Sequence, residues 1–217
     1  MNAAWDYFVN HRHDIYGWTW TTVWLAALPL ALGLLIALPV GWLASRYRWT
    51  YPPIVSGAGL LYTIPSLVLF LVLPAILGTK ILDPVNVAVG LTVYTFALLV
   101  RVVADGLSSV SEATLDAAAA MGYTDRQRLF AVQLPVAVPV IGAGLRVAAV
   151  SNVSLISIAS IIGVTQLGQL FVTGNTDAST PPTVVGLILF VLLALIFDVL
   201  ILFGIRLLTP WQRAVAR

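Results

Sequence analysis

The stretch Thr183–Leu208, which reads TVVGLILFVLLALIFDVLILFGIRLL, decides the class of fold. Its only charged residues are Asp198 and Arg206. A helix needs about 20 mostly apolar residues to cross the hydrocarbon core of a bilayer, whereas a strand of a membrane barrel needs only about 10. The stretch also lacks the alternation of apolar and polar residues that a barrel strand requires. It therefore predicts a membrane-spanning helix, whose backbone satisfies its own hydrogen bonds.

Four other stretches of the chain have the same character. The composition agrees, because 60% of the 217 residues are hydrophobic and only 9% are charged, against about 25% charged in an average soluble domain. We expect an all-α integral membrane protein with five transmembrane helices rather than an ordinary soluble enzyme. The net charge of +2 without a basic patch also argues against nucleic-acid binding. The four further spans are expected at Trp20–Ser45, Ile54–Leu77, Val85–Ala104 and Val136–Val164.

Basic residues indicate the orientation, because cytoplasmic loops carry an excess of lysine and arginine. With five spans, most basic residues fall on one side of the membrane, and only Arg12 and Lys80 fall on the other. We expect residues 1–19 to be an extracytoplasmic segment, residues 20–208 the membrane domain and residues 209–217 a cytoplasmic tail. The larger group consists of Arg46, Arg48, Arg126, Arg128, Arg206, Arg213 and Arg217.

The polar segment Asp105–Pro135 is longer than a connection between two spans requires. Ser109–Glu112 and Thr124–Gln127 each fit the capping box that starts a helix, and Gly122 can end the first helix in the left-handed conformation. We expect two short helices with a sharp corner at Gly122, on the cytoplasmic side between the third and fourth spans. From local physics alone, a docking element for another protein and a connector on the membrane surface explain the segment equally well.

One pattern within this segment is more specific. Asp116-Ala117-Ala118 is followed by Gly122, then by Val132 and Leu134-Pro135. This resembles the cytoplasmic loop of ABC-importer permease subunits, Glu-Ala-Ala-x3-Gly-x9-Ile-x-Leu-Pro, with aspartate in place of glutamate and valine in place of isoleucine. Four shorter strings are similar to those of osmoprotectant permeases. They are Thr63-Ile64-Pro65-Ser66-Leu67, Leu134-Pro135-x3-Pro139-x2-Gly142-x-Gly144-Leu145-Arg146, Gln166-Leu167-Gly168 and Leu208-Thr209-Pro210-Trp211.

The resemblance implies the permease subunit of an ATP-driven importer for osmoprotectants such as glycine betaine, choline or carnitine, in a bacterial cytoplasmic membrane. It implies two copies of an ATPase subunit, a second permease that is identical or related, and an extracytoplasmic substrate-binding protein. The chain has no recognisable nucleotide-binding loop, so ATP and Mg would belong to the ATPase, and this chain would be non-catalytic and without a cofactor. An importer for amino acids or another small solute would carry the same loop. The residues that would couple to the ATPase are Asp116, Ala117, Ala118, Gly122, Arg126, Leu134 and Pro135.

Polar residues inside the fourth span have two interpretations. Ser151, Asn152 and Ser154 could line the translocation path, or they could join neighbouring helices, as small and hydroxyl-bearing residues do in membranes. Helix packing is the better interpretation of the serines, and Asn152 is the best candidate for the path.

Charges inside the spans are expected to pair, because an isolated charge in the bilayer is costly. Arg146 and Asp198 each lie about 10 residues from the cytoplasmic end of their spans, which is roughly 15 Å along a helix. We expect a structural ion pair between these two residues, or a contact of either with Asp105.

Two other classes of function explain the sequence less well than a permease subunit does. An ion-coupled secondary transporter is disfavoured because the chain shows no internal repeat and only Asp198 as an acid well inside a span. An intramembrane enzyme is disfavoured because both histidines, His11 and His13, lie in the N-terminal segment and cysteine is absent. For the same reasons we expect no metal site.

Overall fold

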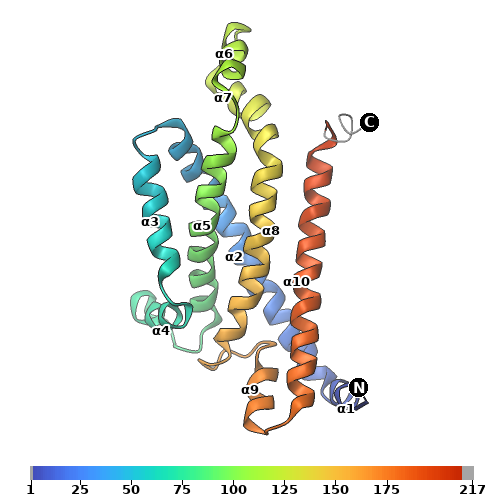
Figure 1. The fold of residues 1–217 in the computed structure, drawn as a ribbon. Coiled ribbons are helices and arrows are strands. Elements are labelled where there is room, and N and C mark those ends of the chain that lie inside the picture. The colour runs from blue at the N-terminus through green and yellow to red at the C-terminus, as the bar shows by residue number, and fades with distance from the viewer. Residues whose placement is uncertain (1, 212–217) are drawn as a thin grey trace.

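The computed structural model describes residues 2–211, and all regular structure in this range is helical (Figure 1). Arg213 and Arg217, which contributed to the predicted orientation, lie outside the described residues. The elements are α1 (Asn2–Asn10), α2 (Arg12–Arg46), α3 (Tyr51–Thr63), α4 (Ser66–Leu77), α5 (Pro84–Ser108), α6 (Glu112–Ala120), α7 (Asp125–Arg128), the π-helical turn η1 (Leu129–Gln133), α8 (Leu134–Ala159), α9 (Gln169–Thr176) and α10 (Thr180–Leu208).

Four helical segments are long and apolar enough to cross a membrane, and they contain α2, α5, α8 and α10. These correspond to four of the five predicted spans. The bounds differ mainly at two ends, because α2 already begins at Arg12 and α8 stops at Ala159. Much of the predicted N-terminal segment is therefore helical, as α1 and the first turns of α2.

The second predicted span, Ile54–Leu77, is broken into two helices. α3 ends at Thr63, α4 begins at Ser66, and the two helices are bent by 100°. The cause is Pro65, which lacks an N–H group and disfavours the helical conformation in the residue before it. Ile64 is accordingly extended, with ψ of 127°. If the bent pair counts as one broken span, the described residues contain five candidate spans, and otherwise four.

Helix α5 lies at the centre of the bundle, in contact with α2, α3, α4 and α8. Glycines of α2 allow a close approach to α5. A Cβ atom at Gly33 would lie 2.5 Å from the side chain of Thr95, and one at Gly41 would lie 2.7 Å from Val103. Between helices in a bilayer, stabilisation comes from such close packing rather than from removing apolar surface from water.

The turn after α8 explains why the fourth span is shorter than predicted. The side chain of Gln166 is fully buried, where it donates to the carbonyl of Ile156 at 3.0 Å and accepts from the N–H of Gly168 at 2.6 Å. The N–H of Leu167, which lies between Gln166 and Gly168, donates to the hydroxyl of Thr22 on α2 at 3.0 Å. These bonds satisfy a buried non-helical backbone, which is tolerated at membrane depth only inside protein.

The two ends of the bundle differ (Figure 1). At one end α6 and α7 project beyond the other helices, and the described C-terminal residues lie at this same end. At the opposite end lie α1, α4 and α9. We call these the α6–α7 end and the α1–α9 end.

Candidate functional site

The segment between α5 and α8 forms a projecting corner of two short helices. Helix α6 begins at Glu112, and its N-cap is Ser111, whose hydroxyl accepts from the N–H of Thr114. The predicted capping box starting at Ser109 is therefore wrong. Helix α5 continues to Ser108, and Ser109 closes it by donating to the carbonyl of Gly106.

Gly122 ends α6 in the left-handed conformation, as predicted, with φ of +85°. The N–H of Gly122 donates to the carbonyl of Ala119 at 2.9 Å, and the N–H of Tyr123 donates to the carbonyl of Ala118 at 3.1 Å. These two bonds are the Schellman motif, which satisfies the last carbonyls of a helix. A residue with a Cβ atom is strained at this φ, so the sharp corner requires glycine.

Helix α7 starts with the predicted capping box. The hydroxyl of Thr124 accepts from the N–H of Gln127, and the side chain of Gln127 accepts from the N–H of Thr124 at 2.8 Å. The helix then runs through η1 directly into α8, so Pro135 lies near the start of α8 rather than at a break. In an ordinary α-helix a proline ring clashes with the carbonyl four residues earlier. The π-helical turn η1 is wider, so it accommodates Pro135 without a break in the helix.

An ion pair fastens the corner to the bundle. The guanidinium of Arg46, at the end of α2, lies 2.5 Å from the carboxylate of Asp125, which also accepts from Arg128. The hydrogen bond from Arg128 and the charge of Arg46 hold the pKa of the Asp125 carboxyl below its ordinary value. All three side chains are partly solvent-exposed, so the pairs position α7 more than they stabilise the fold.

The predicted coupling residues fall into two groups. Asp116, Ala117, Gly122 and Arg126 are exposed on the corner, whereas Ala118 is buried and Leu134 and Pro135 are half-buried. The exposed group therefore combines two charged residues with two small ones.

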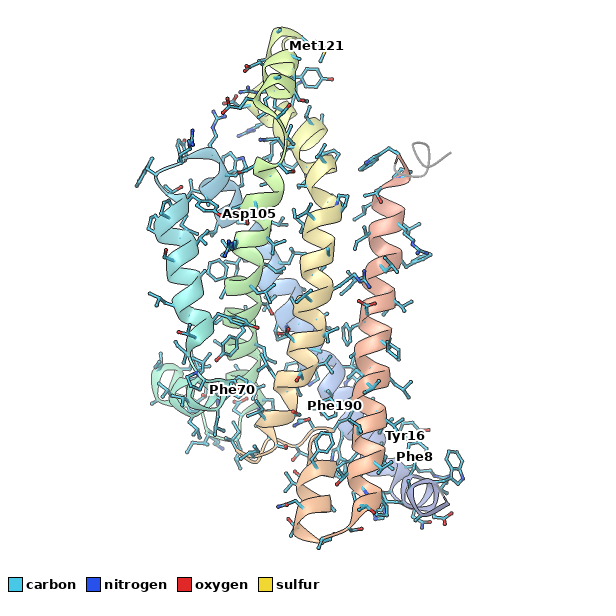
Figure 2. All side chains as sticks on the ribbon, viewed as in Figure 1. Phe8, Tyr16, Phe70, Asp105, Met121 and Phe190 are labelled. Carbon is cyan, nitrogen blue, oxygen red and sulfur yellow. The ribbon has the colours of Figure 1, made fainter. Side chains whose placement is uncertain are left out.

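Sequence reasoning missed three large apolar side chains on the corner. Met121 is 71% exposed and lies at its tip (Figure 2), next to the exposed Tyr123, and Phe130 is 66% exposed on η1. For Met121 and Tyr123, the signal in the sequence was a pair of large residues flanking the helix-ending Gly122. Exposed apolar side chains on a polar projection are typical of a surface that binds another protein.

The structure separates the three polar candidates on α8. Asn152 is 1% exposed, and its amide donates to the hydroxyl of Thr95 on α5 at 2.8 Å. Ser151 is half-buried, and Ser154 is exposed on the same stripe as Val147 and Val150. Within this chain, Asn152 therefore joins two helices.

Arg146 and Asp198 contact each other between α8 and α10. The Nε atom of Arg146 donates to one carboxylate oxygen at 2.6 Å, and its Nη2 atom donates to the other at 2.8 Å. This is the two-pronged geometry that a guanidinium forms with a carboxylate. Neither residue contacts Asp105, which instead accepts from the hydroxyl of Tyr51 and lies 3.5 Å from Arg101.

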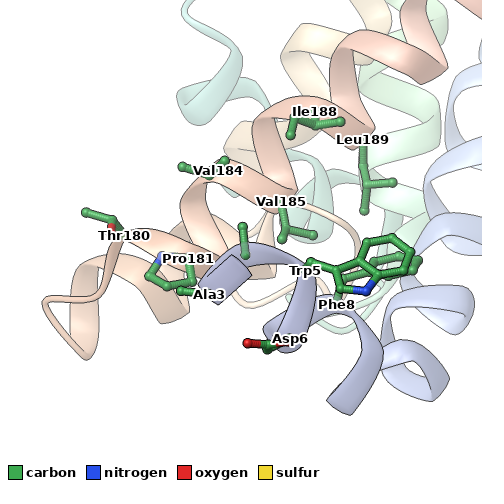
Figure 3. Close-up of a pocket in the computed structure, with 11 residues that line it drawn as sticks. Ala3, Trp5, Asp6, Phe8, Thr180, Pro181, Val184, Val185, Ile188 and Leu189 are labelled. Atoms are coloured by element: carbon green, nitrogen blue, oxygen red, sulfur yellow. The ribbon is translucent and has the colours of Figure 1, made fainter. Parts of the chain in front are cut away.

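A cavity of about 830 Å³ lies between α1 and the start of α10 (Figure 3). Its walls are mostly apolar, and Asp6 is the only charged residue among the lining residues. The side chains of Trp5 and Phe8 lie against each other beside it, with ring centroids 5.8 Å apart. The cavity lies at the α1–α9 end, far from the corner.

The arrangement of spans and corner can now be compared with known proteins. Residues 30–209 match the family described as the binding-protein-dependent transport system inner membrane component. The chain belongs to this family. It is a multi-pass protein of the inner membrane, and the matched range runs from the middle of α2 to the end of α10 and includes the corner.

The chain is also similar to curated permeases. It is 34% identical to the osmoprotectant import permease protein OsmW of Salmonella typhimurium, over 88% of this chain and 90% of that protein. It is 32% identical to the glycine betaine/carnitine/choline transport system permease protein OpuCD of Bacillus subtilis, over 82% of this chain and 77% of that protein.

Solved structures share the fold at lower identity. A chain of the inward-facing MetNI methionine ABC transporter aligns with a TM-score of 0.79 at 22% identity, covering 92% of this chain and 98% of that chain. A chain of an amino acid ABC transporter aligns with a TM-score of 0.72 at 19% identity, covering 92% and 96% respectively. Identities this low establish the common fold and say nothing about the solute.

Proposed function

We propose that this chain is the permease subunit of an ATP-driven importer for osmoprotectants of the quaternary amine class, such as glycine betaine, choline or carnitine. The observation that carries the proposal is the 34% identity to an osmoprotectant import permease across nearly the whole length of both chains. The methionine and amino acid transporters share the fold at 19–23% identity, so they do not favour an amino acid as solute.

In this proposal the α6–α7 end is cytoplasmic, the N-terminus is outside and the C-terminus is inside. The distribution of basic residues supports the orientation. Arg46 and Arg48 follow α2, Arg126 and Arg128 lie in the corner, and Arg206 is in the last turn of α10. Residues 20–208 then form the permease domain, and residues 209–217 a short cytoplasmic tail.

The corner is the element that couples this chain to a cytoplasmic ATPase. The Schellman motif at Gly122 gives it a rigid bend, and exposed Met121 and Phe130 supply apolar contact area. ATP and Mg bind to the ATPase chains, two per complex, while a second permease completes the path and a binding protein delivers the solute from outside. The Arg146–Asp198 pair holds α8 against α10 and has a structural role.

Uptake by the reconstituted complex tests the solute. Proteoliposomes would contain two permeases and the ATPase pair, with ATP inside and the binding protein outside. We expect accumulation of radiolabelled glycine betaine that depends on ATP, with competition by choline or carnitine and none by methionine. ATP-dependent uptake of methionine without uptake of any quaternary amine would overturn the assignment of the solute.

A further inference from the structure

Helices α3 and α5 are antiparallel and meet at two matched pairs of residues. At one pair, the hydroxyl of Tyr51 donates to Asp105 at 2.6 Å. At the other, the rings of Tyr62 and Tyr94 meet edge to face with centroids 5.6 Å apart. Tyr62 follows Tyr51 by 11 residues, and Asp105 follows Tyr94 by the same 11, which is about three turns of each helix. We call the surface between these two pairs the α3–α5 seam.

The charged end of the seam cannot face lipid without a large cost. Arg101 and Asp105 lie one turn apart on α5, an apolar span, and their side chains are 67% and 48% exposed. Charged residues in spans normally face the bundle interior or a water-filled cavity. Arg101 lies inside the predicted third span with the more exposed side chain, so water or another protein must surround it in the membrane, whereas Asp105 lies at the cytoplasmic boundary of that span and faces Tyr51.

The other end of the seam is suited to a cation without hydrogen-bond donors. The C-terminal end of α3 carries the partial negative charge of a helix terminus. The carbonyl of Ile64 at the break is held by the hydroxyl of Tyr94. Beside it, the ring of Tyr62 is 44% exposed. Aromatic faces attract quaternary ammonium groups, which have no proton to donate.

One exposed stripe of α3 beside the two pairs is small and weakly polar, whereas Leu60 and Leu61 are exposed on other sides of the same helix. Pro52, Ser56, Gly59 and Thr63 follow helical spacing and are all exposed, and a Cβ atom at Gly59 would meet nothing within 4 Å. The exposed stripe of α8 is different, because Ser154 lies there among valines, and Asn152 is turned inward onto Thr95.

We infer that the α3–α5 seam lines the translocation path, and that the ring of Tyr62 at the α3–α4 break binds the quaternary ammonium group of the solute. For the nature of the solute, the inference rests on the proposed function. For the position of the path, it rests on the residues of the seam. A second permease closes the seam from the other side.

Because this chain contains no cysteine, single cysteines can be introduced into it without removing native ones, and labelling is read on the band of this chain. The probe is 2-(trimethylammonium)ethyl methanethiosulfonate, a permanently charged thiol reagent, applied to the permease–ATPase complex. Ser56→Cys and Thr63→Cys test the seam. Val147→Cys and Leu195→Cys are matched controls, because both residues are exposed on apolar stripes of other helices. We expect rapid reaction at residues 56 and 63 and slow reaction at 147 and 195. Equal reaction at all four, or faster reaction at 147, would overturn the assignment of the path.

Protection of the Thr63→Cys thiol tests the role of Tyr62. We expect choline to slow the labelling of this thiol, and its uncharged carbon isostere 3,3-dimethylbutanol to have no effect. Adding Tyr62→Leu should abolish protection, whereas Tyr62→Phe should retain it, since a phenyl ring also attracts a cation. Loss of protection with Tyr62→Phe as well would contradict binding through the ring face.

The two proposals fail in different experiments. If wild-type proteoliposomes take up no quaternary amine but residues 56 and 63 still react selectively, the solute is wrong and the path is right. If glycine betaine is taken up while the seam cysteines stay unreactive, the proposed function stands and the α3–α5 seam is not the path.

Discussion

Arg146 of α8 and Asp198 of α10 are joined by two parallel hydrogen bonds of 2.6 and 2.8 Å, across 52 residues of sequence. Both side chains are only partly exposed, at 37% and 25%. They lie in the middle of two long apolar helices, where an unpaired charge of either sign is unfavourable. The pair therefore fixes the rotation and depth of α10 relative to α8.

Removing one member of this pair should lower stability more than replacing both. We expect Asp198→Asn to lower the melting temperature of the complex, because it leaves Arg146 without its counter-charge. The double variant Arg146→Met with Asp198→Leu should recover much of that loss, since apolar residues of similar volume need no partner. Thermal unfolding of the purified complex measures both effects. If Asp198→Asn assembles and unfolds like the wild type but no longer transports, the pair is a functional gate rather than a structural contact.

The crossing of α2 and α5 should not tolerate a methyl group at Gly33. In Gly33→Ala the new Cβ would lie 2.5 Å from Thr95, a β-branched residue with little rotamer freedom. We expect a loss of about 1–3 kcal/mol from overpacking. Gly204→Ala is the matched control, because Gly204 is also helical and a Cβ there meets nothing within 4 Å. Equal melting temperatures of the two variants would show that α2 and α5 are not packed this closely.

Asn152 should contribute to stability through Thr95. We expect a double-mutant cycle between Asn152→Ala and Thr95→Ala to give a coupling energy of about 0.5–1.5 kcal/mol, the range for hydrogen bonds between membrane helices. Denaturation of the purified chain in detergent measures it. An Asn152→Ala variant of unchanged stability whose uptake is lost would instead place this residue on the path.

Acid should loosen the corner. The pKa of Asp125 is held below its ordinary value of 3.8 by Arg128 and Arg46. The stabilising effect of these contacts is therefore present above that ordinary value and is lost as the pH falls through the lowered one. Asp125→Asn mimics the protonated carboxyl, so we expect it to speed backbone hydrogen exchange in residues 124–133 at neutral pH. After correction for intrinsic exchange rates, the variant at neutral pH should exchange as fast as the wild type does in acid. Identical exchange in variant and wild type at neutral pH would show that the ion pairs do not hold α7.

The sequence predicts the long helices well, because length and hydropathy alone determine them. It also predicts the bend at Gly122, since few residues other than glycine end a helix in this way. A full break of the second span was not predicted, because the 24 mostly apolar residues 54–77 are long enough for one spanning helix and a proline need only kink such a helix. The start of α6 was misplaced by two residues because Ser109 and Ser111 are both good N-caps, and only the extension of α5 to Ser108 decides between them.

The candidate site was only partly visible in the sequence. Counting residues along two helices placed Arg146 and Asp198 at the same depth, and the structure joins them. The exposure of Met121 and Phe130 depends on how far the corner projects, which no local pattern contains. The two matched contacts of the α3–α5 seam are 11 residues apart along each helix. They depend on the register between α3 and α5, which is a property of tertiary packing.

The most direct test of the account is ATP hydrolysis by the reconstituted complex, comparing wild type with Met121→Asp. Met121 is exposed in this chain, so a charge at this position should not disturb α6. The charge would become buried when the corner docks on the ATPase, which should break the docking. Glu112→Gln, at the exposed start of the same helix, is the control. We predict that the binding protein loaded with glycine betaine stimulates hydrolysis in wild type and in the control, and that Met121→Asp abolishes the stimulation. Full stimulation in Met121→Asp, or a wild-type chain that never co-purifies with an ATPase, would contradict the claim that the corner couples this permease to ATP.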